Sequence, residues 1–312
     1  MINLAYNRSF FLKMRNPEYR KSVESLLWKL LREDVGKGDI TTLELVPEGK
    51  VKAEIVANEK GVLAGGEEFR WFCRENGILV KQFVKDGERF GKNEKLFVIS
   101  GPERRIFSFE RTGLNLLQRM SGIASETKEI VDKVMRAGHR PAITGTRKTP
   151  WGYLDKKAVT MGGGYSHRLG LWESFMIKDN HLASLSKRGI QDPAGFAIEK
   201  AWNSRKLSVF IEIEVKTVKH ALRAAEKFRE LKDKGKREKP CIIMLDNMKP
   251  KVITKVIRLL KENNLYEYVL LEASGGISKA NVLEYAKTGI DACSLGYLTH
   301  SVKAKDISQE AM

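Results

Sequence analysis

The feature that most constrains this chain is a regular alternation of short apolar runs and amphipathic segments from about residue 141 onward. The apolar runs are typical of strands, and the segments between them have the spacing of helices. The expected strands are PAITGT, SFMIKD, SVFIEIEV, CIIMLD, YVLLEAS and DACSLG. Because strands that alternate with helices pair in parallel, we expect an α/β fold with a parallel sheet closed as a barrel.

Acidic residues recur near the ends of these predicted strands. In SVFIEIEV, Glu212 and Glu214 share one face, since side chains alternate along a strand, and we expect that face to point inward. CIIMLD ends in Asp246, and YVLLEAS carries Glu272 near its end. Active sites of parallel barrels lie at the carboxyl ends of the strands. The pattern therefore predicts an active site at that edge of the sheet.

The first hundred residues have a different rhythm. PEYRKSVESLLWKLLRED and GGEEFRWFCREN have helical spacing, and VKAEIVAN, ILVKQFV and KLFVIS are short β-type runs separated by turn residues. Two further helices, PERRIFSFERTGLNLLQRM and ETKEIVDKVMRAG, follow before the first barrel strand. The chain therefore predicts a compact α+β module in front of the barrel.

The net charge of +17 indicates an anionic partner, which could be a nucleic acid or a small, strongly anionic substrate. The densest basic run, Lys227 to Lys239, alternates in sign, which is typical of the solvated end of a surface helix. This pattern argues against a nucleic-acid partner. A basic nucleic-acid-binding module nevertheless stays open as the alternative to an enzyme.

The cysteine count and the hydropathy pattern indicate in which compartment the protein is expected. The three cysteines, Cys73, Cys241 and Cys293, are odd in number and lack metal-site spacing, so we expect neither disulfides nor zinc but buried small side chains. No stretch approaches the roughly 18 apolar residues of a membrane span, and the first 19 residues lack a signal-peptide core. We expect a cytoplasmic enzyme without a membrane partner.

A series of short motifs carries a family resemblance. TRKT, GGG with HRLGL, IKDNH, IEIEV, IMLDN, EASGGI and LGYLTHS occur in the order found in quinolinate phosphoribosyltransferase, the carboxylating nicotinate-nucleotide pyrophosphorylase. EDVGKGDITT and ERTGLNLLQRMSGIA, further upstream, are similar to that family too. One such motif is a weak signal, but seven in order are strong, and the likeness covers about residues 33 to 307.

The resemblance implies an N-terminal α/β sandwich over residues 1–111, joined by residues 301–312, and an incomplete parallel α/β barrel over residues 112–300. It also implies a homodimer with shared active sites. The implied reaction is a step of NAD biosynthesis: it joins quinolinate to phosphoribosyl pyrophosphate with Mg²⁺ and releases pyrophosphate, CO₂ and nicotinate mononucleotide. A related phosphoribosyltransferase that uses nicotinate or another small acid is the close alternative.

Quinolinate carries two carboxylates beside a ring nitrogen, so its pocket needs several fixed cations, and arginine forks suit carboxylates best. By resemblance the pocket residues are Arg111, Arg147, Lys148, His167, Arg168 and Lys178. The alternative without a binding function is that these charged residues are solvated on a flexible surface loop. Lys178 could also form a Schiff base, as barrel lysines do in aldolases, but neither substrate offers a carbonyl, so we favour a point charge. The resemblance also implies that Arg111 enters the pocket of the neighbouring subunit.

The second group of predicted residues would hold phosphoribosyl pyrophosphate. Glu214 and Asp246 are hard oxygen ligands suited to Mg²⁺, and with Lys148 and Lys178 they are the expected catalytic residues. Backbone N–H groups ahead of the predicted helix SKANVLEYAKTG suit the 5′-phosphate. The remaining substrate-binding candidates are Thr146, Ser274, Gly275, Gly276, Gly296 and His300. The roles of Glu212 and Glu272 stay open between structure and function.

The chain departs from the family pattern after TRKT. Family members commonly continue with Thr-Pro-Gly-Leu-Arg and a longer run, whereas this chain has PWGYLDKKAV, so an arginine is missing and the loop is shorter. The difference leaves Arg147 and Lys148 in place. The resemblance therefore leaves the lid of the pocket, and with it the exact acceptor, open.

Overall fold

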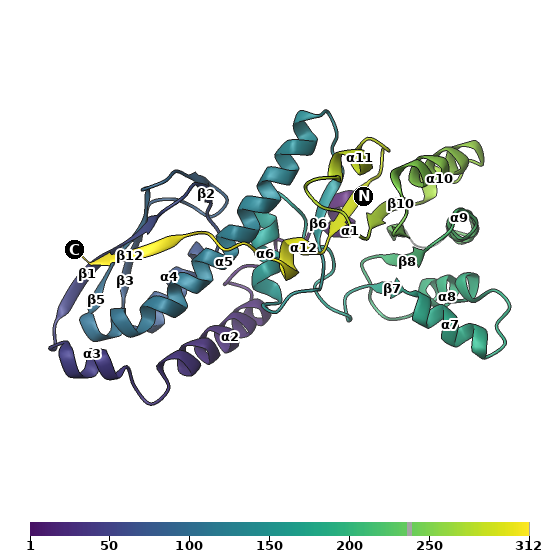
Figure 1. Ribbon diagram of the computed structural model, residues 1–312. Helices are drawn as coiled ribbons and strands as arrows, with labels where there is room; N and C mark the ends of the chain where they lie inside the picture. Colours follow the sequence, from purple (N-terminus) through teal and green to yellow (C-terminus); the bar gives the residue numbers. More distant parts are fainter. Residues whose placement is uncertain (236–238, 312) are drawn as a thin grey trace. The chain divides into compact units, whose positions relative to one another are not determined.

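The computed structural model describes residues 1–235 and 239–311 (Figure 1). The chain divides into two compact units whose segments alternate along the sequence. The first unit consists of Met1–Arg8, Ile130–Arg147 and Tyr165–Tyr297. The second unit consists of Ser9–Glu129, Lys148–Gly164 and residues 298–311. These units divide the chain at other places than the predicted ranges 1–111 and 112–300: Met1–Arg8 groups with the barrel strands, while residues 112–129 and Lys148–Gly164 group with the second unit.

Six parallel strands form the sheet in the described part of the first unit, in the order β6-β11-β10-β9-β8-β7. They are β6 (Ala142–Gly145), β7 (Phe175–Ile177), β8 (Ile211–Val215), β9 (Cys241–Asp246), β10 (Leu270–Ser274) and β11 (Ala292–Leu295). Each strand lies inside a run that the sequence predicts as a strand. Among the described residues β6 does not pair with β7, so the barrel is incomplete and the predicted fold class is confirmed.

Helices follow most of these strands. The described helices of the unit are α1 (Ile2–Tyr6), α7 (Asp179–Lys187), α8 (Pro193–Trp202), α9 (Val218–Asp233), α10 (Pro250–Glu262), the 3₁₀ turn η1 (Tyr266–Tyr268) and α11 (Val282–Ala286). α9 begins where the Thr217 side chain accepts a hydrogen bond from the amide of His220, and its apolar stripe is buried. Part of the basic run that follows it, residues 236–238, lies outside the described residues.

The predicted helix SKANVLEYAKTG is wrong in its extent, because only Val282–Ala286 is helical. The residues ahead of it form a turn: the Asn281 side chain accepts from the amide of Ser278 at 2.8 Å and donates to the carbonyl of Gly276 at 3.0 Å. Asparagine side chains that bond to nearby backbone in this way compete with helix formation. The helix therefore starts seven residues after Gly275 instead of three.

The second unit contains an antiparallel sheet in the order β12-β1-β5-β3. Its strands are β1 (Lys50–Ala57), β3 (Leu79–Gln82), β5 (Lys95–Pro102) and β12 (Ile307–Ala311), and a separate pair joins β2 (Gly61–Val62) to β4 (Arg89–Phe90). α4 (Gly66–Glu75) has a buried face, and its Phe69 ring packs against Phe97 and Phe109. The C-terminal strand β12 pairs with β1, with Ile307 opposite Ala57, so the end of the chain completes this sheet.

The other described helices of this unit are α2 (Pro17–Val35), α3 (Ile40–Leu45), α6 (Tyr153–Met161) and α12 (Tyr297–His300), which starts at the last residue of the first unit. One long helix, α5 (Glu103–Arg136), stands where the sequence predicts two, so that prediction is wrong. Gly122, in the expected break, has a packing role: a Cβ there would lie 2.3 Å from the carbonyl oxygen of Lys303. The glycine allows a close backbone approach without interrupting the helix.

Two further expectations concern residue chemistry. Cys73, Cys241 and Cys293 are buried and not in disulfides, as predicted. In the described part of the chain, no helix combines the length and the apolar character that crossing a membrane requires.

Candidate active site

The carboxyl ends of the parallel strands gather many of the predicted site residues of the first unit. These residues stand at or next to the end of each strand: Thr146, Lys178, Glu214, Asp246, Ser274 and Gly296. The sheet register pairs Ser274 directly with Asp246, and Glu214 with Met244 two residues earlier on β9. Parallel strands therefore bring residues from six separate parts of the sequence to one edge, as the alternating pattern predicts.

Glu214 and Asp246 are half-buried carboxylates on neighbouring strands. Burial raises the pKa of Glu214, and the nearby carboxylate of Asp246 raises it further. Lys178 opposes this effect, with its Nζ 3.9 Å from Oε2 of Glu214. Two carboxylates that repel each other, with the exposed ammonium groups of Lys178 and Lys216 nearby, form a donor set that suits a hard divalent cation such as Mg²⁺.

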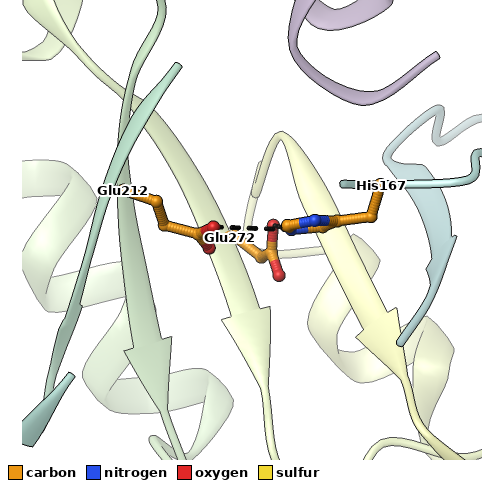
Figure 2. Close-up of side chains that lie close together, drawn as sticks. All are labelled: His167, Glu212 and Glu272. Carbon is orange, nitrogen blue, oxygen red and sulfur yellow. Dashed lines mark hydrogen bonds and ion pairs between the residues drawn. The ribbon is translucent and has the colours of Figure 1, made fainter. Parts of the chain in front are cut away.

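His167 lies deeper in the barrel, between two buried glutamates. Its Nε2 is 3.1 Å from Oε2 of Glu272 and 3.5 Å from Oε2 of Glu212, and Figure 2 shows the three side chains directed toward one another. Glu272 also accepts a hydrogen bond from Oγ of Ser294, whose oxygen lies 2.6 Å from Oγ1 of Thr144. The inward direction predicted for Glu212 is confirmed.

The two carboxylates favour the protonated form of His167. Burial alone would lower the pKa of His167, but Glu272 and Glu212 raise it to about 9. The amide of Arg168 donates to Nδ1 of His167 at 2.7 Å, so the ring proton that this leaves on Nε2 faces Glu272. Burial would also raise the pKa of Glu272, but His167 and the hydrogen bond from Ser294 lower it. Burial and the charge of Glu272 raise the pKa of Glu212. The ligating atoms of the three residues lie within 4.8 Å of one another, a spacing that a metal ion could bridge.

Arg168 follows His167 and is also buried. Its Nη1 donates to the carbonyl of Ser174 and its Nη2 contacts Sδ of Met176, both at 3.1 Å. Within the described residues its buried Nε has no hydrogen-bond partner. Burial and the positive charge of Arg147 lower the pKa of Arg168. Two guanidinium groups close enough to repel each other, one with an unused donor, are suited to an anionic ligand.

Three predicted site residues belong to the second unit. Arg111 is exposed on α5, with Nη2 4.0 Å from Oε1 of Glu110. Lys148 is exposed, and its backbone carbonyl accepts a hydrogen bond from Oγ1 of Thr299 at 2.9 Å. His300 is exposed at the end of α12, with Nδ1 2.7 Å from Oγ of Ser301. The roles of Arg111, Lys148 and His300 rest on the family resemblance.

Gly275 and Gly276 follow β10 in left-handed conformations, with φ of 95° and 62°. A Cβ on Gly275 would lie 2.2 Å from Oδ1 of Asn247, so no other residue fits this turn without displacing that side chain. The prediction that these glycines lie near the start of a helix is wrong, since α11 begins at Val282. Any phosphate seat here would consist of loop amides and not of a helix N-terminus.

The sequence gives no signal for three buried residues that contact the segment around His167: Tyr6, Arg8 and Glu173. The backbone carbonyl of Tyr6 accepts from the amide of His167 at 2.9 Å. Arg8 forms a buried ion pair with Glu173. These contacts join residues about 160 positions apart, which no local pattern in a single sequence can predict.

Comparisons with known proteins agree with this arrangement. Residues 123–310 match the family model of the quinolinate phosphoribosyl transferase C-terminal domain, and residues 39–121 match that of its N-terminal domain. The chain belongs to the quinolinate phosphoribosyltransferase family. Among curated relatives in this family, a probable nicotinate-nucleotide pyrophosphorylase [carboxylating] of Methanocaldococcus jannaschii is 39% identical over 288 residues, covering 91% of this chain and 95% of the relative. A protein of the same description from Methanothermobacter thermautotrophicus is 35% identical, covering 91% and 97%.

Solved structures of the quinolinate phosphoribosyltransferase family have the same fold. The nicotinate-nucleotide pyrophosphorylase of Francisella tularensis superposes with a TM-score of 0.80 at 28% identity, covering 94% of this chain and 96% of that one. A nicotinate-nucleotide pyrophosphorylase structure from Ehrlichia chaffeensis gives a TM-score of 0.78 at 31% identity, covering 93% and 98%. The similarity extends over nearly the whole chain, so both units belong to the family fold.

Proposed function

We propose that the protein transfers the phosphoribosyl group of phosphoribosyl pyrophosphate to the ring nitrogen of quinolinate and removes one carboxylate as CO₂. The products are nicotinate mononucleotide, pyrophosphate and CO₂. The observation that carries the proposal is the buried pair His167 and Arg168, two basic side chains next to each other in the chain, in a unit that also presents two carboxylates at its strand ends. A dianionic acceptor and a metal pyrophosphate need these two kinds of group.

Arg168 is the best-supported residue for binding quinolinate. Its unpaired buried Nε can donate to a carboxylate, and the nearby charge of Arg147 makes an added anion favourable. Lys178, which directly follows β7, supplies an exposed ammonium group. Lys148, next to Arg147 in the chain, has the same proposed role on the family resemblance alone. Quinolinate offers one more carboxylate than nicotinate, so a site with this many cations should prefer it.

Glu214 and Asp246 are proposed to hold Mg²⁺ with the pyrophosphate of the donor. When bound, Mg²⁺ supplies positive charge to the departing pyrophosphate. Glu214 fits this role because burial and the charge of Asp246 both raise its pKa, and a cation would relieve the repulsion between the two carboxylates. Substrate oxygens are proposed to be bound by Thr146, Ser274, Gly275, Gly276, Gly296 and His300.

The proposed residues act mainly by position and charge. The cations hold quinolinate so that its nitrogen faces C1 of the ribose, and the carboxylates at the strand ends stabilise the positive charge that develops on the sugar. Once the nitrogen is alkylated, its positive charge stabilises the carbanion that remains at C2 after CO₂ leaves. The C2 carbanion then takes a proton, so the decarboxylation needs no separate catalytic residue.

We further propose a homodimer in which Arg111 enters the partner's pocket. Arg111 is an exposed arginine on α5, and its ion pair with Glu110 is 4.0 Å long, which is too weak a contact to fix the guanidinium. An isologous dimer would place two such arginines in two shared sites.

The test is an incubation of the protein with Mg²⁺, phosphoribosyl pyrophosphate and either quinolinate or nicotinate. We expect nicotinate mononucleotide and pyrophosphate from quinolinate, and at least 100-fold slower product formation from nicotinate, which lacks one carboxylate. Turnover of nicotinate in preference to quinolinate would assign the protein to the sibling activity. Salt-sensitive binding of duplex DNA without any response to quinolinate would contradict the enzyme assignment.

A further inference from the structure

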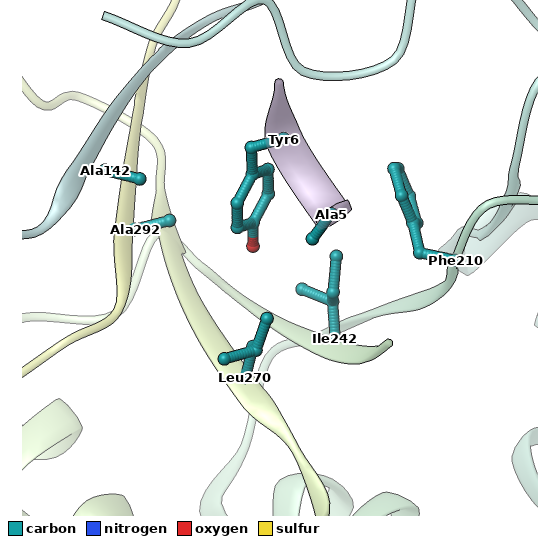
Figure 3. Close-up of a cluster of buried hydrophobic side chains, with 7 residues drawn as sticks. All are labelled: Ala5, Tyr6, Ala142, Phe210, Ile242, Leu270 and Ala292. Carbon is teal, nitrogen blue, oxygen red and sulfur yellow. The ribbon is translucent and has the colours of Figure 1, made fainter. Parts of the chain in front are cut away.

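Ala5 and Tyr6, from the first eight residues, occupy the amino-terminal end of the barrel interior, while Met1 and Leu4 are exposed. Tyr6 is fully buried, and its ring packs in a cluster of apolar side chains from α1 and the starts of the strands (Figure 3): Ala5, Ala142, Phe210, Ile242, Leu270 and Ala292. The Tyr6 ring also lies 5.3 Å from the ring of His167, measured between centroids. α1 therefore fills the end of the barrel opposite to the carboxyl ends of the strands.

The backbone of this segment also holds the turn that contains His167. The carbonyl of Tyr6 accepts from the amide of His167 at 2.9 Å and from Oγ of Ser166 at 3.1 Å. Oγ of Ser166 in turn accepts from the amide of Arg8 at 2.9 Å. His167 has a φ of 54°, in the left-handed region that residues other than glycine adopt only when their surroundings impose it. The contacts with Tyr6 and Arg8 impose it here.

Arg8 makes the second connection through its side chain. Its buried guanidinium donates to the carbonyls of Leu4, Ala5 and Asn7, so it closes the C-terminal end of α1. It also forms an ion pair with one oxygen of Glu173, whose other oxygen accepts from the amide of Leu169 at 2.6 Å. α1 and the segment 166–173 are thus tied together at both ends of the His167–Arg168 pair.

We propose that residues 2–8 are a positioning element for the acceptor pocket, with Arg8 and Glu173 as its key pair. This inference rests on the proposed function, because it assumes that His167 and Arg168 bind quinolinate. Residues 2–8 touch neither Glu214 nor Asp246 in the described contacts, so loosening them should weaken quinolinate binding and spare the donor. The N-terminal segment, which lies ahead of the matched family domains at residues 39–121 and 123–310, therefore sets the affinity for the acceptor.

The test uses the full-length protein with Arg8→Met, which keeps the side-chain length but removes the guanidinium, and Arg8→Lys, which keeps the charge. We expect the KM for quinolinate, and its Kd in calorimetry, to rise about tenfold in Arg8→Met and less in Arg8→Lys, since small displacements of binding groups have effects of this size. The KM for phosphoribosyl pyrophosphate should change less than about twofold. Glu173→Gln should have a similar effect, and the double variant should be no worse than either single one.

The matched control is Arg258→Met, which removes an exposed arginine whose Nε is 3.8 Å from Glu262 on α10 and should leave all constants unchanged. Folding of each variant is checked by its thermal transition, and Arg8→Lys serves if Arg8→Met does not fold. A folded Arg8 variant with unchanged quinolinate affinity, or with both KM values raised equally, overturns the positioning role. Absence of quinolinate turnover in the unmodified protein would instead overturn the proposed function.

Discussion

Replacing Glu272 with glutamine should change how the stability of the protein depends on pH. Glu272 is fully buried and lies 3.1 Å from Nε2 of His167 through Oε2. The substitution keeps the shape of the side chain and its acceptor for Ser294 but removes the negative charge. His167 then keeps only Glu212, at 3.5 Å, as an acidic partner, so the pKa of His167 should fall toward its ordinary value.

The size of the effect follows from the pKa of His167. A folded-state pKa of about 9, against an ordinary value of 6.5, corresponds to about 3 kcal/mol of folding free energy. Because this pKa is raised, the contribution is complete below pH 6.5 and is lost as the pH rises through about 9. Since Glu212 remains, we expect Glu272→Gln to lose roughly half of it, on the order of 1–2 kcal/mol at pH 6.

The assay is urea unfolding of the unmodified protein and of Glu272→Gln from pH 6 to pH 10. We expect the unmodified protein to be more stable at pH 6, and its advantage to shrink or reverse by pH 10, where neutral His167 leaves two buried carboxylates without a cation. Groups outside this cluster cancel in the comparison. Glu212 does not, because Glu272 is one of the causes that raise its pKa to about 7, so the trend reports on the His167, Glu212 and Glu272 cluster as a whole. Glu262→Gln, at an exposed ion pair, should show no such trend. A stability difference that stays constant over this pH range would refute the raised pKa of His167.

Three further predictions concern the proposed reaction. Asp246→Asn should reduce turnover by roughly 10²-fold while calorimetry shows unchanged quinolinate binding, because it removes a charge at the transition state; near-normal turnover would place the metal elsewhere. Arg168→Lys keeps the charge but loses the planar fork, so quinolinate should bind at least about tenfold more weakly in calorimetry, and an unchanged Kd would reject Arg168 as a clamp. Arg111→Ala and Lys178→Ala should each be inactive alone, but a mixture of the two chains should recover about a quarter of the wild-type activity, because half of the dimers are hybrids with one intact site of two. A mixture that stays inactive after verified subunit exchange would exclude a shared site.

The sequence predicts those parts of the site that depend on periodicity. Glu212 and Glu214 are two residues apart, so strand alternation places both inside the barrel, and the end of each predicted strand locates Asp246 and Ser274. Strand periodicity is a local property and survives folding because one side of each strand must be buried. It does not distinguish depth, which is why the roles of Glu212 and Glu272 become clear only when His167 is seen between them.

The remaining features depend on contacts that no local pattern contains. A glycine such as Gly122 can mark a helix break or a close approach, and only the carbonyl of Lys303 beside it decides for the approach. Gly162, in the GGG motif, would place a Cβ 2.4 Å from the carbonyl oxygen of Ala124, so it too serves packing. In the sequence, Arg8 is one of several isolated basic residues, and only its ion pair with Glu173 in the structure shows that it has a role. The α5 helix and the N-terminal segment were unpredictable for this reason.

The central claim is that this protein forms a pyridine nucleotide and removes the carboxylate next to the ring nitrogen. The most direct measurement uses quinolinate that carries labelled carbon in either the C2 or the C3 carboxyl group, with phosphoribosyl pyrophosphate and Mg²⁺. We predict that the C2 label appears as CO₂, one for each pyrophosphate released, and that the C3 label stays in nicotinate mononucleotide. Release of the C3 label, CO₂ formed without pyrophosphate, or a nucleotide product that keeps both carboxylates would contradict the proposed reaction.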